Sequence, residues 1–204
     1  MDIKDILVQG LKDGVGQFFD SVADQIQEQS KASLNMYYET LKEIEALLEK
    51  IGGHGKFDKN FKRADDICGF AYFTALIVSG QDIEGAEFQN ALEGLEDNSL
   101  KDYFCDLYYR WEQTKVFVES GAFKSLVLEI EGLIPFLGSL FMTSLTEECD
   151  AYFESILTLI MLDDSKGLFA TRKMKKKISP YSEKMYSVCT TYSFIIQIKL
   201  ESYD

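Results

Sequence analysis

Residues 34–51 read LNMYYETLKEIEALLEKI, and their apolar members recur in steps of three and four. These members are Leu34, Tyr37, Leu41, Ile44, Leu48 and Ile51. An average spacing of about 3.5 residues keeps such side chains on one side of an α-helix and is typical of a seam between two helices that wrap around each other. The stretch therefore predicts a helix that packs lengthwise against a second helix.

A second amphipathic helix is predicted upstream, over residues 3–26. Its apolar residues lie mostly four apart and are Ile3, Leu7, Leu11, Val15, Phe18, Val22 and Ile26. Three glycines within it each cost about 1 kcal/mol relative to alanine, so we expect docking to stabilise this helix. The seam of residues 34–51 is short for a free coiled coil, which favours an intramolecular hairpin between the two helices.

The best linker in the chain follows the seam, at Gly52-Gly53-His54-Gly55. Three glycines in four residues cannot continue a helix at low cost. We therefore place a domain boundary here, with an N-terminal helical hairpin at residues 1–51 and a helical bundle domain at residues 56–204.

The remainder of the chain predicts further helices, because apolar residues recur at helical spacing and only 2 Pro occur in 204 residues. The expected helices cover residues 57–79, 83–95, 100–118 and 122–133, with a fifth beginning near Thr146. In the third, Tyr103, Leu107, Trp111 and residues 116–118 are expected to face inward. Residues 192–200 also alternate as an edge strand would, but helix is favoured because no partner strand is evident. The predicted fold class is all-α, a helical bundle.

The net charge of -13 limits the classes of binding partner that we expect. An acidic chain repels nucleic acid and anionic membrane surfaces, so nucleic-acid binding is not expected, and peripheral membrane association stays open but is not favoured. The longest apolar stretches fall short of the roughly 20 residues that a membrane span needs.

The four cysteines form no close pair and have apolar or aromatic neighbours. Buried free thiols and a cytoplasmic location are therefore predicted.

Catalytic and metal-binding patterns are weak. The chain has one histidine, His54, in the glycine turn, so no Cys/His or Ser/His/Asp set can be assembled and we expect neither an enzyme nor a cofactor. The only candidates for metal ligation are Asp82, Glu87, Asp163 and Asp164. The adjacent carboxylates of Asp65-Asp66 and of Asp163-Asp164 would point about 100° apart on a helix, so each pair offers few ligands to a hard cation, and solvated helix-end charge is the simpler interpretation.

Candidate interaction residues occur in two places. A basic run departs from the acidic background and contains Arg172, Lys173, Lys175, Lys176 and Lys177. It is either a solvated surface or a docking patch for an acidic partner, a phosphate or the chain's own acidic half. On the first helix, Phe18 and Phe19 are candidates for protein contacts, because its polar side is acidic, whereas helices that lie on membranes are usually basic there.

One stretch carries a family resemblance. Residues 73–92 read FTALIVSGQDIEGAEFQNAL: an apolar helix, a short turn, an isoleucine, and a glutamate that opens the next helix. This pattern resembles the TerB-like (tellurite-resistance protein B) family, with a fainter second unit at residues 156–174, and the resemblance covers residues 57–192. Gly80-Gln81 stands where the family has Asp-Gly, which leaves Glu87 on the pattern, and Thr171-Arg172-Lys173 stands where the second unit would have its glutamate.

The resemblance implies an all-helical bundle and a non-enzymatic cytoplasmic protein of stress-response or phage-related systems that works by binding other proteins. The predicted function is accordingly a protein-interaction module. The alternative is a phage or mobile-element inhibitor that blocks a host or defence protein by occupying its surface. A protein partner is expected, and a homodimer stays open.

Overall fold

The computed structural model describes residues 3–80, 86–95, 97–131, 144–163, 166–167 and 169–203. These residues form α1 (Ile3–Lys50), α2 (Ala64–Ser79), α3 (Ala86–Glu93), α4 (Asn98–Glu119), α5 (Gly121–Glu131), α6 (Leu145–Met161) and α7 (Ala170–Glu201). Within these ranges the backbone holds no β-strand beyond an isolated bridge between Ile51 and Phe57. The predicted all-α bundle is confirmed, and the ambiguous residues 192–200 are helical.

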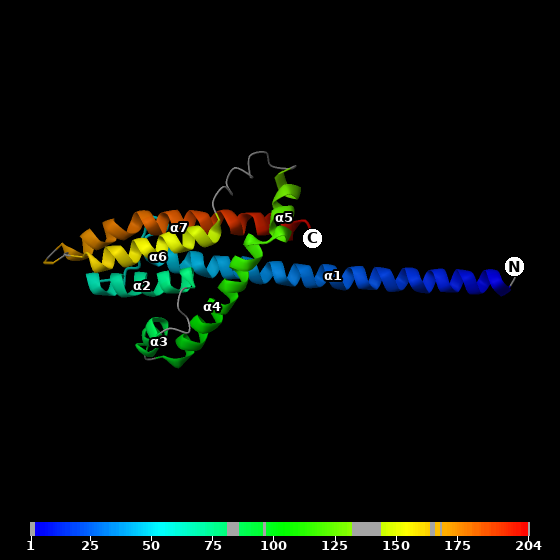
Figure 1. The fold of residues 1–204 in the computed structure, drawn as a ribbon, viewed down its shortest axis with the longest axis horizontal. Helices are drawn as coiled ribbons and strands as arrows, with labels where there is room; N and C mark the ends of the chain where they lie inside the picture. The colour runs from blue at the N-terminus through cyan, green and yellow to red at the C-terminus, as the bar shows by residue number, and fades with distance from the viewer. Residues whose placement is uncertain are drawn as a thin grey trace.

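The predicted N-terminal hairpin is wrong. Ile3–Lys50 is one uninterrupted helix of 48 residues, which Figure 1 shows extending far beyond the other helices. The polar residues 25–33 that suggested a break contain no glycine or proline. Glutamine, glutamate, lysine and alanine are good helix formers. The polar residues 25–33 therefore continue the helix and expose it to solvent there, rather than ending it.

The apolar seam of residues 34–51 is real, but its main partner is α7. Leu41, Ile44, Leu48 and Ile51 are fully buried, and α4 and α2 also contact α1. This part of α1 belongs to the same buried cluster as residues of α2 to α7. The division into residues 1–51 and 56–204 therefore does not coincide with a break in the hydrophobic core.

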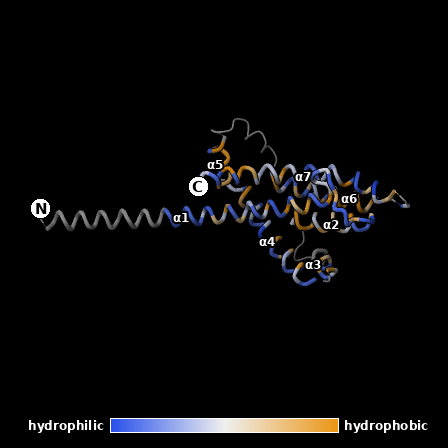
Figure 2. The backbone as a smooth tube through the Cα atoms, turned by 180° about the vertical axis from the view of Figure 1, so that it is seen from behind, coloured by the Kyte–Doolittle hydropathy of each residue, from blue (hydrophilic) through white to orange (hydrophobic). Residues whose placement is uncertain are grey.

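The bundle places α1, α2, α6 and α7 alongside one another, while α4 crosses α1 obliquely (Figure 1). The N-terminus lies at one end of the long axis and the connection between α6 and α7 at the other, as both Figure 1 and Figure 2 show. The N-terminal part of α1 and the connection between α6 and α7 therefore form the two opposite ends of the molecule.

Side chains of α4 cap the carboxyl end of α2. Trp111 donates its indole N–H to the carbonyl of Val78 at 2.7 Å, and Lys115 donates to the carbonyl of Ser79 at 2.8 Å. Tyr108 donates its hydroxyl to the carbonyl of Gly80 at 2.9 Å. The last carbonyls of a helix have no partner within it, so three donors spaced three and four apart along α4 satisfy three successive acceptors.

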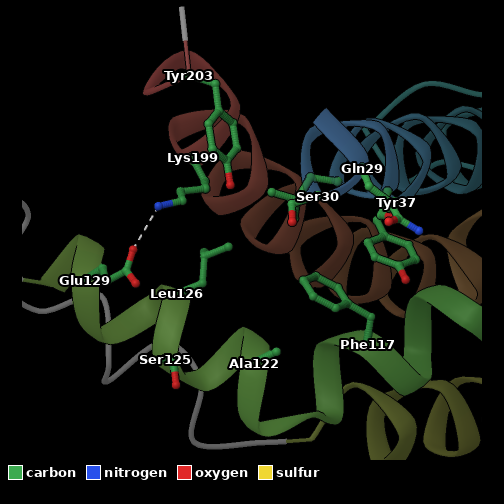
Figure 3. A pocket seen from close by; sticks show the side chains of 12 residues that line it. Gln29, Ser30, Tyr37, Phe117, Ala122, Ser125, Leu126, Glu129, Lys199 and Tyr203 are labelled. Carbon is green, nitrogen blue, oxygen red and sulfur yellow. Dashed lines mark hydrogen bonds and ion pairs between the residues drawn. The ribbon is translucent and has the colours of Figure 1, made fainter. Parts of the chain in front are cut away.

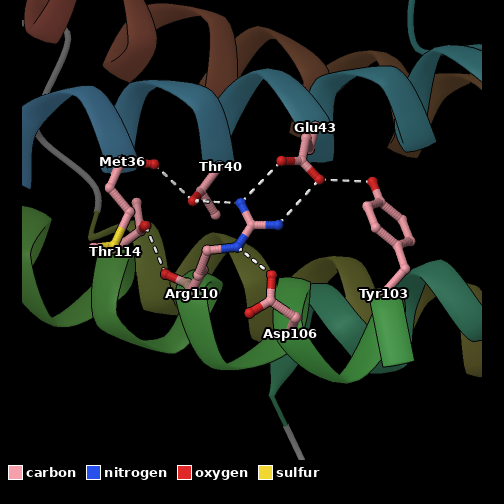
Figure 4. Close-up of polar contacts among 7 residues, drawn as sticks. All are labelled: Met36, Thr40, Glu43, Tyr103, Asp106, Arg110 and Thr114. Carbon is pink, nitrogen blue, oxygen red and sulfur yellow. Dashed lines mark hydrogen bonds and ion pairs between the residues drawn. The ribbon is translucent and has the colours of Figure 1, made fainter. Parts of the chain in front are cut away.

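A polar cluster joins α4 to α1 (Figure 4). The Arg110 guanidinium donates to both carboxylate oxygens of Glu43 at 2.9 and 3.2 Å, and to Asp106 at 2.8 Å. The Tyr103 hydroxyl also donates to Glu43, at 2.7 Å. Burial raises the pKa of Glu43, but the hydrogen bonds from Arg110 and Tyr103 outweigh it and lower the pKa overall. The cluster holds α4 across α1 beside the buried seam.

Two expectations for α4 are wrong. Leu107 and Trp111 are buried as predicted, whereas Tyr103 is 39% and Val116 is 70% exposed. The side of α4 that meets the core includes Tyr108 and Lys115 in their place, because polar groups on that side serve the end of α2. A prediction that places only apolar residues on the buried side of a helix cannot identify a buried lysine such as Lys115.

Candidate interaction site

The outer part of α1 is the most prominent feature of the surface. Residues 3–28, which we call the arm, continue the helix away from the bundle, and no other described helix lies beside the arm in Figure 1. Residues 24, 25, 27 and 28, whose side chains are described, are exposed. The arm is therefore a single helix that leaves the core near residue 30.

The sequence of the arm is strongly two-sided. At 100° per residue, the seven apolar positions from Ile3 to Ile26 fall within an arc of about 140°. Four of the five acidic positions of the arm fall on the opposite side of the helix, namely Asp5, Asp13, Asp20 and Asp24. Phe18 and Phe19 lie on the arm, but their side chains lie outside the part that the structure describes. A sequence pattern of this kind is typical of a helix that packs its apolar side against another surface.

A pocket of about 510 Å³ opens at the base of the arm, between α1, the α4–α5 corner and the end of α7 (Figure 3). The ring of Tyr37 stacks on that of Phe117, with centroids 4.3 Å apart. Lys199 donates to Glu129 at 2.9 Å, and this hydrogen bond raises the pKa of Lys199. The pocket thus has an aromatic wall on one side and an ion pair on the other.

The pocket and the arm are continuous along α1. Gln29 and Ser30 line the pocket and follow directly on the arm, and Leu34 and Tyr37 line it one and two turns further on. A helix that ran along the arm toward the bundle would therefore meet this pocket.

A second cavity, of about 810 Å³, lies between α2, α3 and α4. Its lining is mainly aromatic and aliphatic and includes Phe61, Phe70, Phe73, Leu95, Leu100 and Phe104. Sites for small molecules normally add a few convergent polar groups that fix the ligand's orientation. The charged lining residues here are Lys50 and Asp66, so the cavity does not define a ligand.

The basic run lies on the first turns of α7. Some of its side chains are exposed to solvent, and others contact residues of the fold. Arg172, Lys173 and Lys176 are exposed. Lys175 lies over the ring of Phe57, 5.2 Å from its centroid, and Lys177 pairs with Asp163 at 3.3 Å. The structure therefore leaves three of the five predicted interaction residues of the basic run available to solvent.

A second basic group lies beside this run. Thr171 donates its hydroxyl to the backbone carbonyl of Lys62 at 3.2 Å, across 109 positions of sequence. Lys59, Lys62 and Arg63 are thereby brought next to the start of α7, and all three are exposed. Sequence reasoning missed this group because three scattered cations near the start of α2 are unremarkable until the fold joins them to α7.

Of the four metal candidates, only Asp163 has a side chain that the structure describes. Asp82 and Asp164 lie outside the described residues, as does the side chain of Glu87, and Asp163 pairs with Lys177. Among the residues that the structure describes, no three His, Cys, Asp or Glu side chains are placed to hold a metal ion.

The cysteines are poor nucleophiles in this fold. All four are free thiols, with Cys149 and Cys189 buried and Cys68 and Cys105 half-buried. Burial raises the pKa of each thiol. Since the thiolate is the reactive form, such groups stay largely protonated and unreactive at neutral pH.

His54 is exposed and contacts the ring of Tyr186, with centroids 5.5 Å apart.

Comparison with known proteins identifies no relative: no family model, no curated protein and no solved structure matches the chain. The TerB-like resemblance of residues 57–192 stays a prediction. In the described part of the chain, none of the helices combines the length and the apolar character that crossing a bilayer requires.

Proposed function

We propose that the protein is a non-enzymatic interaction module whose arm binds another protein through its apolar side. The observation that carries this proposal is the continuation of α1 as a single helix beyond the bundle, with seven apolar residues along one side. Most helices in proteins owe their stability to packing of an amphipathic side rather than to intrinsic propensity. The arm contains three glycines, so a partner that covers its apolar side would supply the missing stabilisation.

The mode of recognition follows from the spacing. Helices that dock in apolar grooves, or beside another helix, use anchors three, four and seven residues apart. Leu7, Leu11, Val15 and Phe18 have that spacing. Fully burying one such side chain contributes about 1.5–3 kcal/mol, so a few anchors are enough for specific binding.

The chemistry of the partner follows from charge. The polar side of the arm carries four aspartates, so a partner that presents lysine or arginine beside an apolar stripe is electrostatically complementary. The pocket at the base of the arm would receive the end of such a partner. A setting in a stress-response or phage-related system is supported by the TerB-like resemblance alone.

Introducing charge on the apolar side of the arm is expected to abolish partner binding while leaving the bundle folded. In a variant with Leu11→Glu and Phe18→Glu, loss of two buried anchors should weaken the affinity at least about 100-fold. The partner is first co-purified with the wild-type chain from its source cells, and the dissociation constant is then measured with both purified components.

The matched control adds the same two charges to the polar side, with Gln9→Glu and Gln17→Glu. This control should bind at least as tightly as the wild-type chain, because the added carboxylates complement a basic partner. Equal losses in the two variants, or full binding by the first, would contradict the proposal. Sedimentation equilibrium covers the case of a second copy: a mass twice 23.3 kDa that only the Leu11/Phe18 variant loses would identify the partner as the chain itself.

A further inference from the structure

The fold separates the charge of the chain along its length. Residues 58–66 and 163–177 together hold nine Lys and Arg against five Asp, whereas the rest of the chain holds 12 basic and 29 acidic residues. The contact between Thr171 and Lys62 brings the two segments together at the end of the bundle opposite the arm. We call the exposed cations there the basic end: Lys59, Lys62, Arg63, Lys166, Arg172, Lys173 and Lys176.

The acidic groups of this region are largely used within the fold. Asp65 accepts from Arg63 at 2.8 Å, Asp66 accepts the backbone N–H of Arg63 at 3.0 Å, and Asp163 pairs with Lys177. In the described part of the chain, Arg172, Lys173 and Lys176 have no carboxylate within ion-pair distance. Their charge is therefore directed to solvent.

Large apolar side chains are exposed at the same end. Met161 is 75%, Leu162 is 74% and Phe169 is 66% exposed, and these three flank the connection between α6 and α7. Figure 1 places this connection at the extremity of the long axis. Exposed apolar side chains therefore lie at this end of the molecule together with Lys166, and the other cations of the basic end lie beside the starts of α7 and α2.

We propose that this end of the bundle binds the surface of an anionic lipid bilayer. Met161, Leu162 and Phe169 enter the headgroup region, and the cations of the basic end contact the anionic headgroups. An apolar edge backed by lysine and arginine matches the bilayer interface, where apolar burial and attraction to anionic lipid act together. A protein partner would need a pocket shaped for each protruding side chain, whereas lipid accommodates any shape.

The overall charge of -13 does not oppose this binding. At physiological ionic strength the Debye length is about 8 Å. The 32-residue helix α7 is about 48 Å long, so most of the acidic surface lies several Debye lengths from a bilayer at the tip. The sequence-based expectation against membrane association used the net charge of the whole chain. The fold places most of the acidic residues away from the basic end, so the net charge does not describe the surface that would face the bilayer.

Vesicle binding tests the proposal with the full chain. We expect sedimentation with vesicles of phosphatidylcholine that contain about 30 mol% phosphatidylserine, but not with phosphatidylcholine alone. A variant with Lys173→Gln and Lys176→Gln should partition about 25-fold less, because each surface lysine contributes about five-fold. Its control, with Lys101→Gln and Lys124→Gln, removes the same charge from α4 and α5 and should partition as the wild type does.

Entry of the tip into lipid has its own readout. The sole tryptophan, Trp111, is fully buried, so the indole introduced by Phe169→Trp reports on the tip. Its emission should shift to the blue, and brominated lipid should quench it, only with the anionic vesicles. The proposal is overturned by any of three results: no binding to the anionic vesicles, equal loss in the two lysine variants, or unchanged emission of the bound Phe169→Trp variant. Binding of the same lysines to soluble polyglutamate or RNA but not to vesicles would overturn it in favour of a soluble polyanion.

Discussion

Replacing Trp111 with alanine is expected to lower the free energy of unfolding by about 4–5 kcal/mol. The side chain is completely buried, and truncation of a buried tryptophan or phenylalanine costs about 3–5 kcal/mol through lost burial and the cavity left behind. The substitution also removes the 2.7 Å hydrogen bond to the carbonyl of Val78, which leaves a buried acceptor without its donor. Urea unfolding followed by far-ultraviolet circular dichroism measures the change.

Tyr109 provides the matched control on the same helix. Its side chain is 61% exposed, so Tyr109→Ala should change the free energy of unfolding by less than about 1 kcal/mol. Similar losses at the two positions would mean that α4 does not bury the side of the helix that carries Trp111.

Replacing Lys115 with methionine is expected to lower the free energy of unfolding by about 2–3 kcal/mol. Methionine preserves the apolar stem but not the charge, so the carbonyl of Ser79 loses its 2.8 Å donor and Glu112 loses its paired cation. Lys115 and Ser79 are buried, so the carbonyl left without its donor is costly, whereas the Glu112 carboxylate is 38% exposed and keeps contact with water. Thermal and urea unfolding of the variant measure this cost.

The corresponding change at an exposed lysine, Lys124→Met on α5, should leave stability within about 0.5 kcal/mol. If Lys115→Met unfolds like the wild type, the side chain of Lys115 contributes nothing to the end of α2. The capping of α2 by α4 would then rest on Trp111 and Tyr108.

The helices were largely predictable because apolar spacing is a local signal. Steps of three and four mark the buried side of α1 over residues 34–51, and the buried Cys149, Tyr152 and Ile156 follow the same spacing along α6. In α7 the alternation of residues 192–200 was misleading: Tyr192, Ile195 and Ile196 are buried while Phe194 is 48% exposed, which is helical periodicity.

The arrangement of the helices was not predictable, because it depends on contacts between distant residues. Whether the polar residues 25–33 form a turn or a helix is decided by the absence of a glycine or proline, and the predicted hairpin gave their polarity too much weight. The partner of the α1 seam is α7, more than a hundred residues downstream. The basic end likewise requires Lys62 and Thr171 to meet, and no local pattern indicates that contact.

The candidate site was predicted in part. The amphipathic residues 3–26 and the run from Arg172 to Lys177 were both identified from the sequence. The sequence did not show that the first of these leaves the bundle as an arm, or that Lys175 and Lys177 contact Phe57 and Asp163.

Site-specific photo-crosslinking in the source cells tests the central claim most directly, namely that the apolar side of the arm binds a partner protein. The photoreactive amino acid p-benzoylphenylalanine is placed at Phe18 on the apolar side, or at Asp20, which lies about 200° around the helix. A discrete protein adduct at position 18 that is absent at position 20 is the result we predict. No adduct at position 18, or the same adducts at both positions, would contradict binding through the apolar side of the arm.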